Sequence, residues 1–410
     1  MNQTEVATAN GKKTLPEGWR WLRLGEVCEE KSGTRDPRSE PDKPFQYVDI
    51  TSVDAVTKKI VAPKTLLGGV APSRARQVIR TGNVLIATTR PNLNVVALVS
   101  QEFDDQICST GFCVLCPRDG LDSAYLFAFV QSTEFIQSLS DLVTGALYPA
   151  VTDKQVRAQH IPLPPLEEQQ RITAILHEQL VAVERARAAT EAQLEAANAI
   201  PAAYLRTVFN GPEAKQWPIK NVADVCKTID YGFTASAYFS IREPRFLRIT
   251  DIQNGGVIWD QVPGCRISSN EEAANRLVDG DIVFARTGAT TGKSFLVQQP
   301  PRAVFASYLI RLRAKSDVAP EYLYGFFQSD GYWRQIRAHA RGAGQPNVNA
   351  TLLGSIELPI PSLADQQRIA AQLSAQMASG ERLRRTLTEQ LDAINRLPAA
   401  LLRRAFGGEL

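Results

Sequence analysis

Pro162-Leu-Pro-Pro-Leu-Glu-Glu-Gln-Gln-Arg-Ile172 is a segment that the chain repeats, with few changes, as Pro359-Ile-Pro-Ser-Leu-Ala-Asp-Gln-Gln-Arg-Ile369. The match continues toward the C-terminus, where Pro201-Ala-Ala-Tyr-Leu-Arg206 corresponds to Pro398-Ala-Ala-Leu-Leu-Arg403. Residue 162 pairs with 359 and residue 201 with 398, a constant displacement of 197. Solenoid repeats have periods of about 20–50 residues, so this self-match indicates duplication of a domain-sized unit.

Each copy of the segment opens a long helical pattern. Acidic residues follow the proline-rich stop, where they suit the positive end of a helix. Apolar or small residues then recur at alternating steps of four and three, as in the heptads of a coiled coil. Two such helices in one chain are expected to pack on each other, antiparallel if a pseudo-two-fold axis relates the copies. The predicted coiled-coil positions are Ile172, Leu176, Val183, Leu194, Ile369, Leu373, Leu383, Leu387 and Ile394.

Two prolines stand late in these helical patterns, at Pro201 and Pro398. A proline inside a helix removes one hydrogen bond and clashes with the preceding turn. We therefore expect each proline to be the first residue of a short closing helix. From Leu166 to Ile200, the first long helix would measure about 50 Å at ~1.5 Å per residue.

Composition limits the possible classes of protein. The 410 residues leave room for two or three domains, and 44% hydrophobic with 22% charged residues is typical of a globular protein. The net charge of +3 implies that any nucleic-acid surface is local. Residues 1–14 are polar and no apolar run approaches a membrane span, so we expect a cytoplasmic protein without a membrane partner.

Catalytic and metal-binding patterns are not found in the sequence. Cys113 and Cys116 lie in a strand-like run, where residues three apart point to opposite faces, so buried thiols are favoured over a zinc site. The three histidines are scattered and offer no ligand spacing. No cofactor fingerprint and no adenine-methyltransferase motif is present. We therefore expect no catalytic residue, no metal and no cofactor on this chain.

The globular parts of the chain are duplicated too. The opening of the first copy, Leu15–Cys28, has its counterpart in Trp217–Cys226. Gly82–Ala87 and Gly280–Ala285 each read as a turn into a buried strand. The aromatic-rich runs Tyr125-Leu-Phe-Ala-Phe-Val-Gln-Ser132 and Tyr322-Leu-Tyr-Gly-Phe-Phe-Gln-Ser329 are expected to form core helices. The order is globular unit, helix, globular unit, helix.

The loops differ between the copies, although the helices and strands agree. Thr88–Asn94 follows one buried strand and Arg286–Ser294 follows its equivalent, and both are rich in side chains that bond base edges and phosphates. Polar loops are usually only solvated, but equal scaffolds with different loops favour a bipartite reader of two half-targets. The candidate DNA-binding residues, including those just before each long helix, are Thr88, Thr89, Arg90, Asn92, Asn94, Tyr148, Arg286, Thr287, Thr290, Thr291, Lys293, Gln345, Asn347 and Asn349.

The second loop also imitates a phosphate-binding motif. A Walker A sequence has four residues between its glycines, whereas Gly288-Ala-Thr-Thr-Gly-Lys-Ser294 has three. The residues that follow, Phe295-Leu-Val297, read as a strand and not as the required helix. Nucleotide binding is therefore disfavoured, while contact of Lys293 with a DNA phosphate stays plausible.

These features resemble the DNA-specificity subunit of type I restriction-modification systems. The resemblance rests on the duplicated Glu/Asp-Gln-Gln-Arg-Ile segment, the two tryptophan-containing openings and the terminal Ala405-Phe-Gly-Gly-Glu-Leu410. It covers nearly the whole chain beyond the first 14 residues. It implies an α+β fold with two pseudo-symmetric target-recognition domains, joined by two long helices that pack as an antiparallel coiled coil. Such a protein reads a split, asymmetric DNA sequence.

The resemblance also implies partners. Two modification subunits would methylate adenine with S-adenosylmethionine, and two restriction subunits would use ATP and Mg²⁺. The expected boundaries are a disordered tail at 1–14, recognition domains at 15–161 and 212–358, and helical spacers at 162–211 and 359–410. The alternatives are a scaffold that pairs protein partners through its coiled coil without binding DNA, and a P-loop nucleotide hydrolase.

Overall fold

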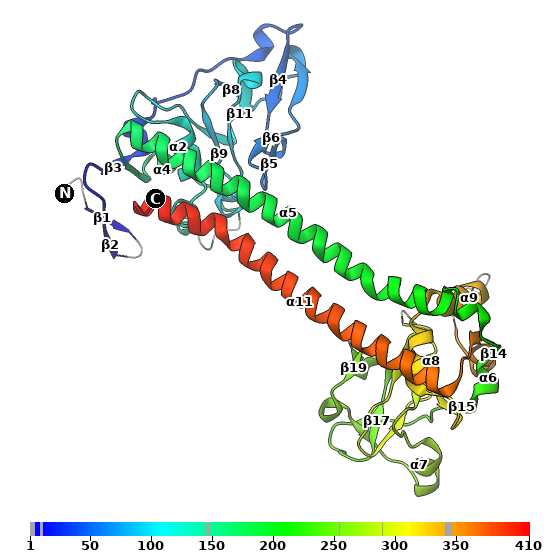
Figure 1. Ribbon diagram of the computed structural model, residues 1–410. Coiled ribbons are helices and arrows are strands. Elements are labelled where there is room, and N and C mark those ends of the chain that lie inside the picture. The colour runs from blue at the N-terminus through cyan, green and yellow to red at the C-terminus, as the bar shows by residue number, and fades with distance from the viewer. Residues whose placement is uncertain are drawn as a thin grey trace. The chain divides into compact units, whose positions relative to one another are not determined.

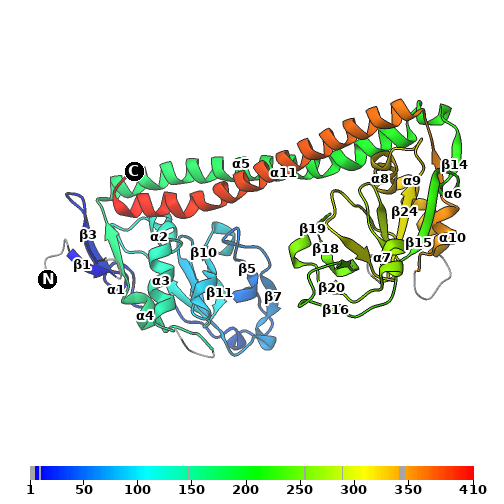
Figure 2. The same ribbon diagram turned by 90° about the horizontal axis from the view of Figure 1, so that it is seen from below.

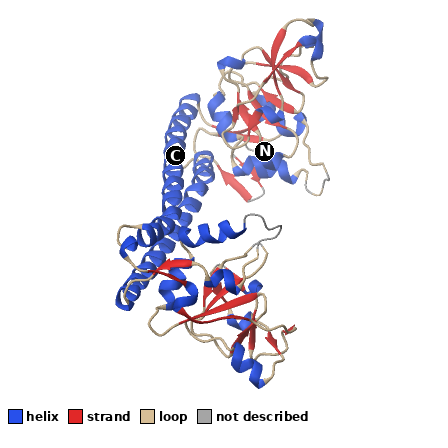
Figure 3. Cartoon of the chain, turned by 90° about the vertical axis from the view of Figure 1, so that its right-hand side faces the viewer, coloured by secondary structure: helices blue, strands red, loops and turns tan. Residues whose placement is uncertain are grey.

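The structure, a computed structural model, describes residues 5–8, 11–143, 145, 148–253, 255–288, 290–340 and 347–410. The chain divides into two compact units (Figure 1): unit 1 comprises residues 1–190 with 390–410, and unit 2 comprises residues 191–389. Each unit contains both helices and strands (Figure 3), so the α+β class is confirmed.

Two helices of 45 residues each, α5 (Leu166–Asn210) and α11 (Leu363–Gly407), contribute to both units. In unit 1 the start of α5 lies beside the end of α11 (Figure 1). The two ends share a core that includes Ile172 and Phe406. In unit 2 the end of α5 shares a core with the start of α11, through Phe209 and Ile369. The helices therefore run antiparallel, as the duplication predicted.

Most predicted seam positions are buried, but Leu383 is 44% exposed, so its assignment to the coiled coil is wrong. The buried or half-buried positions of α11 around it are Leu373, Met377, Gly380, Leu387, Leu391 and Ile394, which alternate steps of four and three except for the seven residues between Gly380 and Leu387. The heptad spacing is therefore kept, but Met377 and Leu391 place its second apolar position one residue later than the phase of Leu383. Leu194 is half-buried. The confirmed buried positions are Ile172, Leu176, Val183, Ile369, Leu373, Leu387 and Ile394.

The two prolines do not begin separate helices, and that prediction is wrong. Pro201 lies inside α5 and Pro398 inside α11, both of which continue without interruption. A proline cannot donate to the carbonyl four residues earlier, so the carbonyls of Ala197 and Ile394 lose their usual donor. The packing of each helix against its unit outweighs this cost.

Unit 1 is built around β9, whose four apolar residues are all buried. Val84 and Ile86 enter the core beneath the long helices, while Leu85 and Ala87 face a second core. Opposite faces of one strand thus serve two cores, which explains the continuous apolar run. Its sheets are β10 (Val96–Leu98)-β9 (Val84–Ala87)-β12 (Phe112–Leu115), β7 (Lys64–Leu67)-β4 (Pro44–Val48)-β11 (Gln106–Ser109)-β8 (Ala75–Ile79), β3 (Arg20–Arg23)-β13 (His160–Leu163), and β5 (Val53–Asp54)-β6 (Lys59–Ile60).

The short helices of unit 1 pack against these strands. Figure 2 shows α2 beneath the C-terminal part of α11. The rings of Tyr125 in α2 and Phe406 in α11 are in contact. The aromatic run at 125–132 is therefore a core helix, as expected. These helices are α1 (Leu24–Val27), α2 (Ser123–Phe129), α3 (Thr133–Asp141) and α4 (Asp153–Arg157).

Unit 2 repeats this architecture around β21, with Ile282 and Phe284 in one core and Val283 in another. One strand is added: β15 extends the sheet on the far side of β24. The sheets are β15 (Cys226–Tyr231)-β24 (Leu309–Ala314)-β21 (Ile282–Ala285)-β22 (Ser294–Leu296), β16 (Ala237–Tyr238)-β20 (Gly264–Cys265)-β17 (Arg245–Leu247)-β23 (Ala303–Phe305), β14 (Ile219–Asn221)-β25 (Glu357–Pro359), and β18 (Ile252–Gln253)-β19 (Gly256–Val257). The helices are α6 (Val222–Val225), α7 (Ser269–Asn275), α8 (Pro320–Phe327), α9 (Asp330–Ala340) and α10 (Ala350–Gly354).

The duplicated glutamine has the same structural role in both copies. Gln169 is fully buried at the start of α5, where its Oε1 accepts from the Asp122 N–H (2.8 Å) and its Nε2 donates to the Gly120 carbonyl (2.9 Å). Gln366 accepts from the Ala319 N–H (2.9 Å) at the start of α11. The segment that reveals the duplication therefore ties each long helix to the loop before a core helix.

A duplicated tyrosine makes a second pair of equivalent bonds. The Tyr125 hydroxyl donates to the Pro162 carbonyl, and the Tyr322 hydroxyl donates to the Pro359 carbonyl, both at 2.7 Å. Each bond joins a core helix to the strand that leads into a long helix. The two copies therefore agree in individual side-chain contacts as well as in chain path.

The N-terminal residues differ from the predicted disordered tail. Within 1–14, the strands β1 (Glu5–Thr8) and β2 (Gly11–Thr14) pair antiparallel. The polar composition that predicted disorder does not exclude a hairpin, whose backbone bonds need no apolar side chain.

Candidate nucleic-acid interface

The predicted loop of unit 1 lies beside the segment that precedes the long helix. The Arg90 N–H donates to the Pro149 carbonyl and the Val151 N–H to the Thr88 carbonyl, both at 2.8 Å. Thr89 forms an isolated bridge with Ala150. The structure thus brings Thr88, Thr89, Arg90 and Tyr148 to one edge of the unit, although about 60 residues of chain separate them.

Exposed side chains at this edge are available to a ligand. Thr89, Arg90 and Asn92 are exposed, and Tyr148 is 85% exposed. Thr88 is half-buried, and its hydroxyl donates to the Gly111 carbonyl (2.9 Å). Its side chain is therefore engaged within the protein, unlike those of its neighbours.

Two residues with left-handed backbone conformation flank the turn in this loop. Arg90 and Asn94 have φ values of 51° and 45°, and they flank the 3-10 turn Pro91–Leu93. Asparagine tolerates this conformation well, whereas arginine adopts it at a cost. A strained, exposed arginine in a polar loop favours a functional role for Arg90.

Asn94, by contrast, is not available to DNA, and that part of the prediction is wrong. The residue is buried, and its amide donates to the Val130 carbonyl (2.7 Å). Its Oδ1 accepts from the Lys58 ammonium (3.0 Å), which also contacts the Asn94 carbonyl. Burial lowers the pKa of Lys58. Asn94 therefore anchors the loop to the β5–β6 hairpin.

The predicted loop of unit 2 is the turn of the β21–β22 hairpin. The Arg286 N–H donates to the Tyr308 carbonyl (3.1 Å), and the Arg286 carbonyl accepts from the Val348 N–H (2.9 Å). Thr88 of unit 1 makes the equivalent two backbone bonds, to Gly111 and Val151. The segments before each long helix thus meet equivalent loops in both units.

Some side chains of the second loop are exposed to solvent, and others form contacts within the turn. Thr287 and Lys293 are exposed, while Thr290 and Thr291 are half-buried. The Thr291 hydroxyl donates to the Gly288 carbonyl (2.7 Å) and so closes the turn. A strand follows the lysine where a phosphate-binding loop requires a helix, so the rejection of a Walker A site is supported.

The asparagines of unit 2 have different settings. Asn347 is exposed. The Asn349 side chain accepts from the Leu352 N–H (2.7 Å) and caps α10, so part of its hydrogen-bonding capacity is already used. Gln345 lies outside the described residues.

Sequence reasoning missed an aromatic and arginine cluster on unit 2. The Arg248 Cζ lies 5.9 Å from the ring centroid of Phe239, which is 76% exposed. The Arg266 Cζ lies 5.8 Å from the ring of Tyr238. Exposed aromatic rings next to cations can stack on bases or pack against sugars. The adjacent aromatic residues Tyr238 and Phe239 were the available signal.

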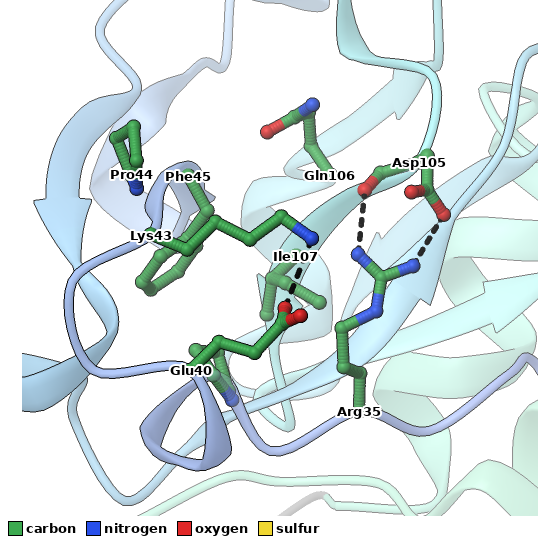
Figure 4. Close-up of a pocket in the computed structure, with 9 residues that line it drawn as sticks. Arg35, Glu40, Lys43, Pro44, Phe45, Asp105, Gln106 and Ile107 are labelled. Carbon is green, nitrogen blue, oxygen red and sulfur yellow. Dashed lines mark hydrogen bonds and ion pairs between the residues drawn. The ribbon is translucent and has the colours of Figure 1, made fainter.

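A small cavity in unit 1 is a weaker candidate. It has a volume of about 90 Å³, and Figure 4 shows its charged lining. The Arg35 guanidinium contacts Asp105, and Lys43 contacts Glu40 at 2.9 Å. Because these cations already have acidic partners, the cavity offers no free charge to an anion.

The described residues give no support for a metal site or a membrane span. Among the described residues, no group of three or more His, Cys, Asp and Glu is placed to hold a metal ion. Cys113 is buried in β12, and burial raises the pKa of its thiol. No helix in the described part of the chain is long and apolar enough to cross a membrane.

Comparison with known proteins identifies the fold. The family model described as "Type I restriction modification DNA specificity domain" matches residues 16–195 and again residues 213–393. The chain belongs to this family. Both matches include a globular part and most of the following helix, so the duplication seen in the sequence is a duplication of this family's domain.

Individual relatives agree with this assignment. The specificity subunit of the type I restriction enzyme EcoKI from Escherichia coli (strain K12) is 24% identical over 372 residues, which covers 86% of this chain and 79% of that protein. The HsdS subunit from Thermoanaerobacter tengcongensis has a crystal structure that is 32% identical, with a TM-score of 0.75. That match covers 97% of this chain and 98% of the other. A structure from a study of complex assembly and conformational transition of the type I restriction-modification system is 31% identical, with a TM-score of 0.78, and covers 97% of this chain and 100% of its own.

Proposed function

We propose that this specificity subunit reads a bipartite, asymmetric DNA target with one unit per half. One observation carries the proposal. Thr88 and Arg286 make the same pair of backbone bonds in the two units, yet they carry different side chains and open loops of different sequence. Equal scaffolds place the loops alike, while different loops recognise different bases.

The loops are assigned to different kinds of contact. Arg90, exposed and strained, is proposed to contact a base edge in the half read by unit 1. Lys293, exposed at the hairpin turn, is proposed to contact a phosphate. Thr89, Asn92, Tyr148, Thr287 and Asn347 are exposed beside them and complete the proposed interface.

The long helices are proposed to set the gap of unread base pairs between the two halves. Each long helix begins in one unit and ends in the other, so its length is proposed to limit how far apart the two half-targets can lie. The catalytic work is assigned to partners: two modification subunits that methylate adenine with S-adenosylmethionine, and two restriction subunits that use ATP and Mg²⁺. The isolated chain is expected to show no methyltransferase, nuclease or ATPase activity.

Selection from a random double-stranded DNA library tests this function. The chain, assembled with its modification subunits, should enrich two short sequences at a fixed spacing. Replacement of the 88–94 loop should change one of the two sequences and leave the other and the spacing unchanged. Enrichment of no sequence would favour the scaffold alternative, in which the coiled coil pairs proteins without DNA.

A further inference from the structure

Arg286 has a side chain held in place by an aromatic ring and a fixed acceptor. Its Cζ lies 4.7 Å from the ring centroid of Tyr231, a distance at which a guanidinium stacks on the ring. Its Nη1 donates to the Ser307 carbonyl (3.2 Å). The side chain therefore leaves the sheet in one orientation, set by the strand β15 that unit 1 lacks.

Both supports of Arg286 are themselves fixed. The Tyr231 hydroxyl accepts from the Ala350 N–H (3.0 Å), at the start of α10. The Ser307 N–H donates to the Phe233 carbonyl (2.9 Å), and its hydroxyl is bonded to that of Thr234 (3.1 Å). The guanidinium thus rests on a platform made before any ligand binds, which lowers the entropy lost on binding.

The donors of Arg286 are only partly used. Its Nε is buried without a partner, and its Nη2 has no hydrogen-bond acceptor among the residues that the structure describes. The side chain is half-buried, beside Tyr308, which is 60% exposed. Thr88, at the same backbone position of unit 1, turns its hydroxyl back onto Gly111. In unit 2, therefore, the Nη2 group of Arg286 has donors left for a ligand. In unit 1, the Thr88 hydroxyl already donates to the Gly111 carbonyl.

We propose that Arg286 reads a guanine in the half-target of unit 2, with Tyr231 as its positioning residue. The proposal rests on the proposed function of the chain. Guanine alone presents two neighbouring acceptors, N7 and O6, in the major groove, and the guanidinium fork matches them with two donors. Adenine offers one acceptor beside a donor, and thymine offers one acceptor beside a methyl group. Lysine keeps the charge but lacks the planar fork that stacks on Tyr231, so it would match these acceptors less selectively.

Selection from a random double-stranded DNA library, with the chain assembled with its modification subunits, tests the assignment. The wild-type complex should enrich a guanine at one position of the unit 2 half. Arg286→Lys should relax that position by about tenfold or more in guanine preference, and every other position should keep its preference. Because lysine keeps the charge, overall affinity should change less than it does for an alanine variant.

Two further variants separate positioning from mere stability. Tyr231→Phe keeps the stacking ring and should retain the guanine preference. Tyr231→Leu removes the ring and should relax the same position as Arg286→Lys, while the rest of the half-target remains selected. Thr88→Ala in unit 1 serves as the matched control and should leave the guanine position unchanged.

The outcomes distinguish this inference from the proposed function. A wild-type complex that enriches no two-part sequence overturns both. A two-part sequence that Arg286→Lys leaves unchanged at every position, or weakens equally at all of them, overturns the inference alone. Equal loss of selectivity in both halves after Tyr231→Leu also overturns the positioning role.

Discussion

The ring of Phe406, near the end of α11, packs edge-on against Tyr125 of unit 1, with 5.2 Å between the ring centroids. Phe209, near the end of α5, meets the equivalent Tyr322 of unit 2 with its ring tilted, at 5.5 Å. In the order of the sequence, Phe406 belongs to the second copy and Phe209 to the first. Each unit is therefore completed by the helix end of the other copy.

Removal of either phenylalanine should destabilise one unit selectively. Phe406→Ala deletes a buried ring that also contacts Phe129, and the expected cost is about 3–5 kcal/mol. Hydrogen exchange should show lower amide protection in unit 1 and unchanged protection in unit 2. Leu397→Ala, at an exposed position of the same helix, is the control and should have little effect. Uniform loss of protection in both units would contradict the exchange of helix ends.

The buried Gln169 of the repeated segment should contribute more to the free energy of unfolding than its exposed neighbour Gln170. Gln169→Leu leaves the Asp122 N–H and the Gly120 carbonyl without a partner, which we expect to cost about 1–3 kcal/mol for each group that stays buried. Gln170→Leu changes an exposed side chain and should be nearly neutral. Urea denaturation of both variants measures the difference. Equal stability of the two would show that the contact of Gln169 is not needed.

Arg90 should separate stability from recognition. Glycine suits a φ of 51°, so Arg90→Gly should leave the stability of unit 1 equal to or above that of the wild type. If the side chain reads a base, the same variant should lose about 1–3 kcal/mol of discrimination at one position of one half-target. Thermal denaturation and library selection measure the two effects. A stable variant with unchanged selectivity would remove Arg90 from the interface.

Lys293 should contribute affinity without selectivity. Lys293→Ala is expected to weaken binding to all sequences alike and to reduce the slope of log K against log salt by about 1. Binding measured at several salt concentrations gives this slope directly. Lys220→Ala, on the exposed strand β14, is the control for loss of one positive charge. A variant that alters the selected bases would indicate a base contact instead.

The length of α5 and α11 should set the number of unread base pairs between the two half-targets. Four residues inserted after Thr190 and four after Glu389 lengthen both helices where the chain passes from one unit to the other. The added ~6 Å of helix corresponds to one or two base pairs at ~3.4 Å each. Because four residues exceed one turn slightly, some affinity should be lost. Methylome sequencing should return unchanged half-targets with a wider gap. An unchanged gap in an active complex would rule out this role.

The sequence predicted the features that the two copies share. The repeated segment, the buried strands β9 and β21 and the aromatic helices were found because comparison of one copy with the other separates scaffold from loop. Leu383 was misassigned because the second apolar position of the heptad in α11 lies one residue later than predicted, as the half-buried Met377 and Leu391 show. Asn94 was misassigned because composition cannot show that Lys58, far along the chain, binds its side chain. The stacking of Arg286 on Tyr231 could not be predicted, because β15 has no counterpart among the described strands of the first copy.

The exchange of helix ends has an evolutionary consequence. In a chain with a single copy, the phenylalanine at the end of the long helix would have no tyrosine to pack against. The core tyrosine of the same chain would likewise lack its phenylalanine partner. Two identical chains of this kind would complete each other's cores and form a symmetric homodimer. On the proposed function, in which each unit reads one half-target, such a dimer would read a palindrome. Duplication within one gene keeps these contacts between the copies and allows the two loops to differ in sequence. New specificities can then arise by recombination of one half, while the residues that hold the halves together stay the same.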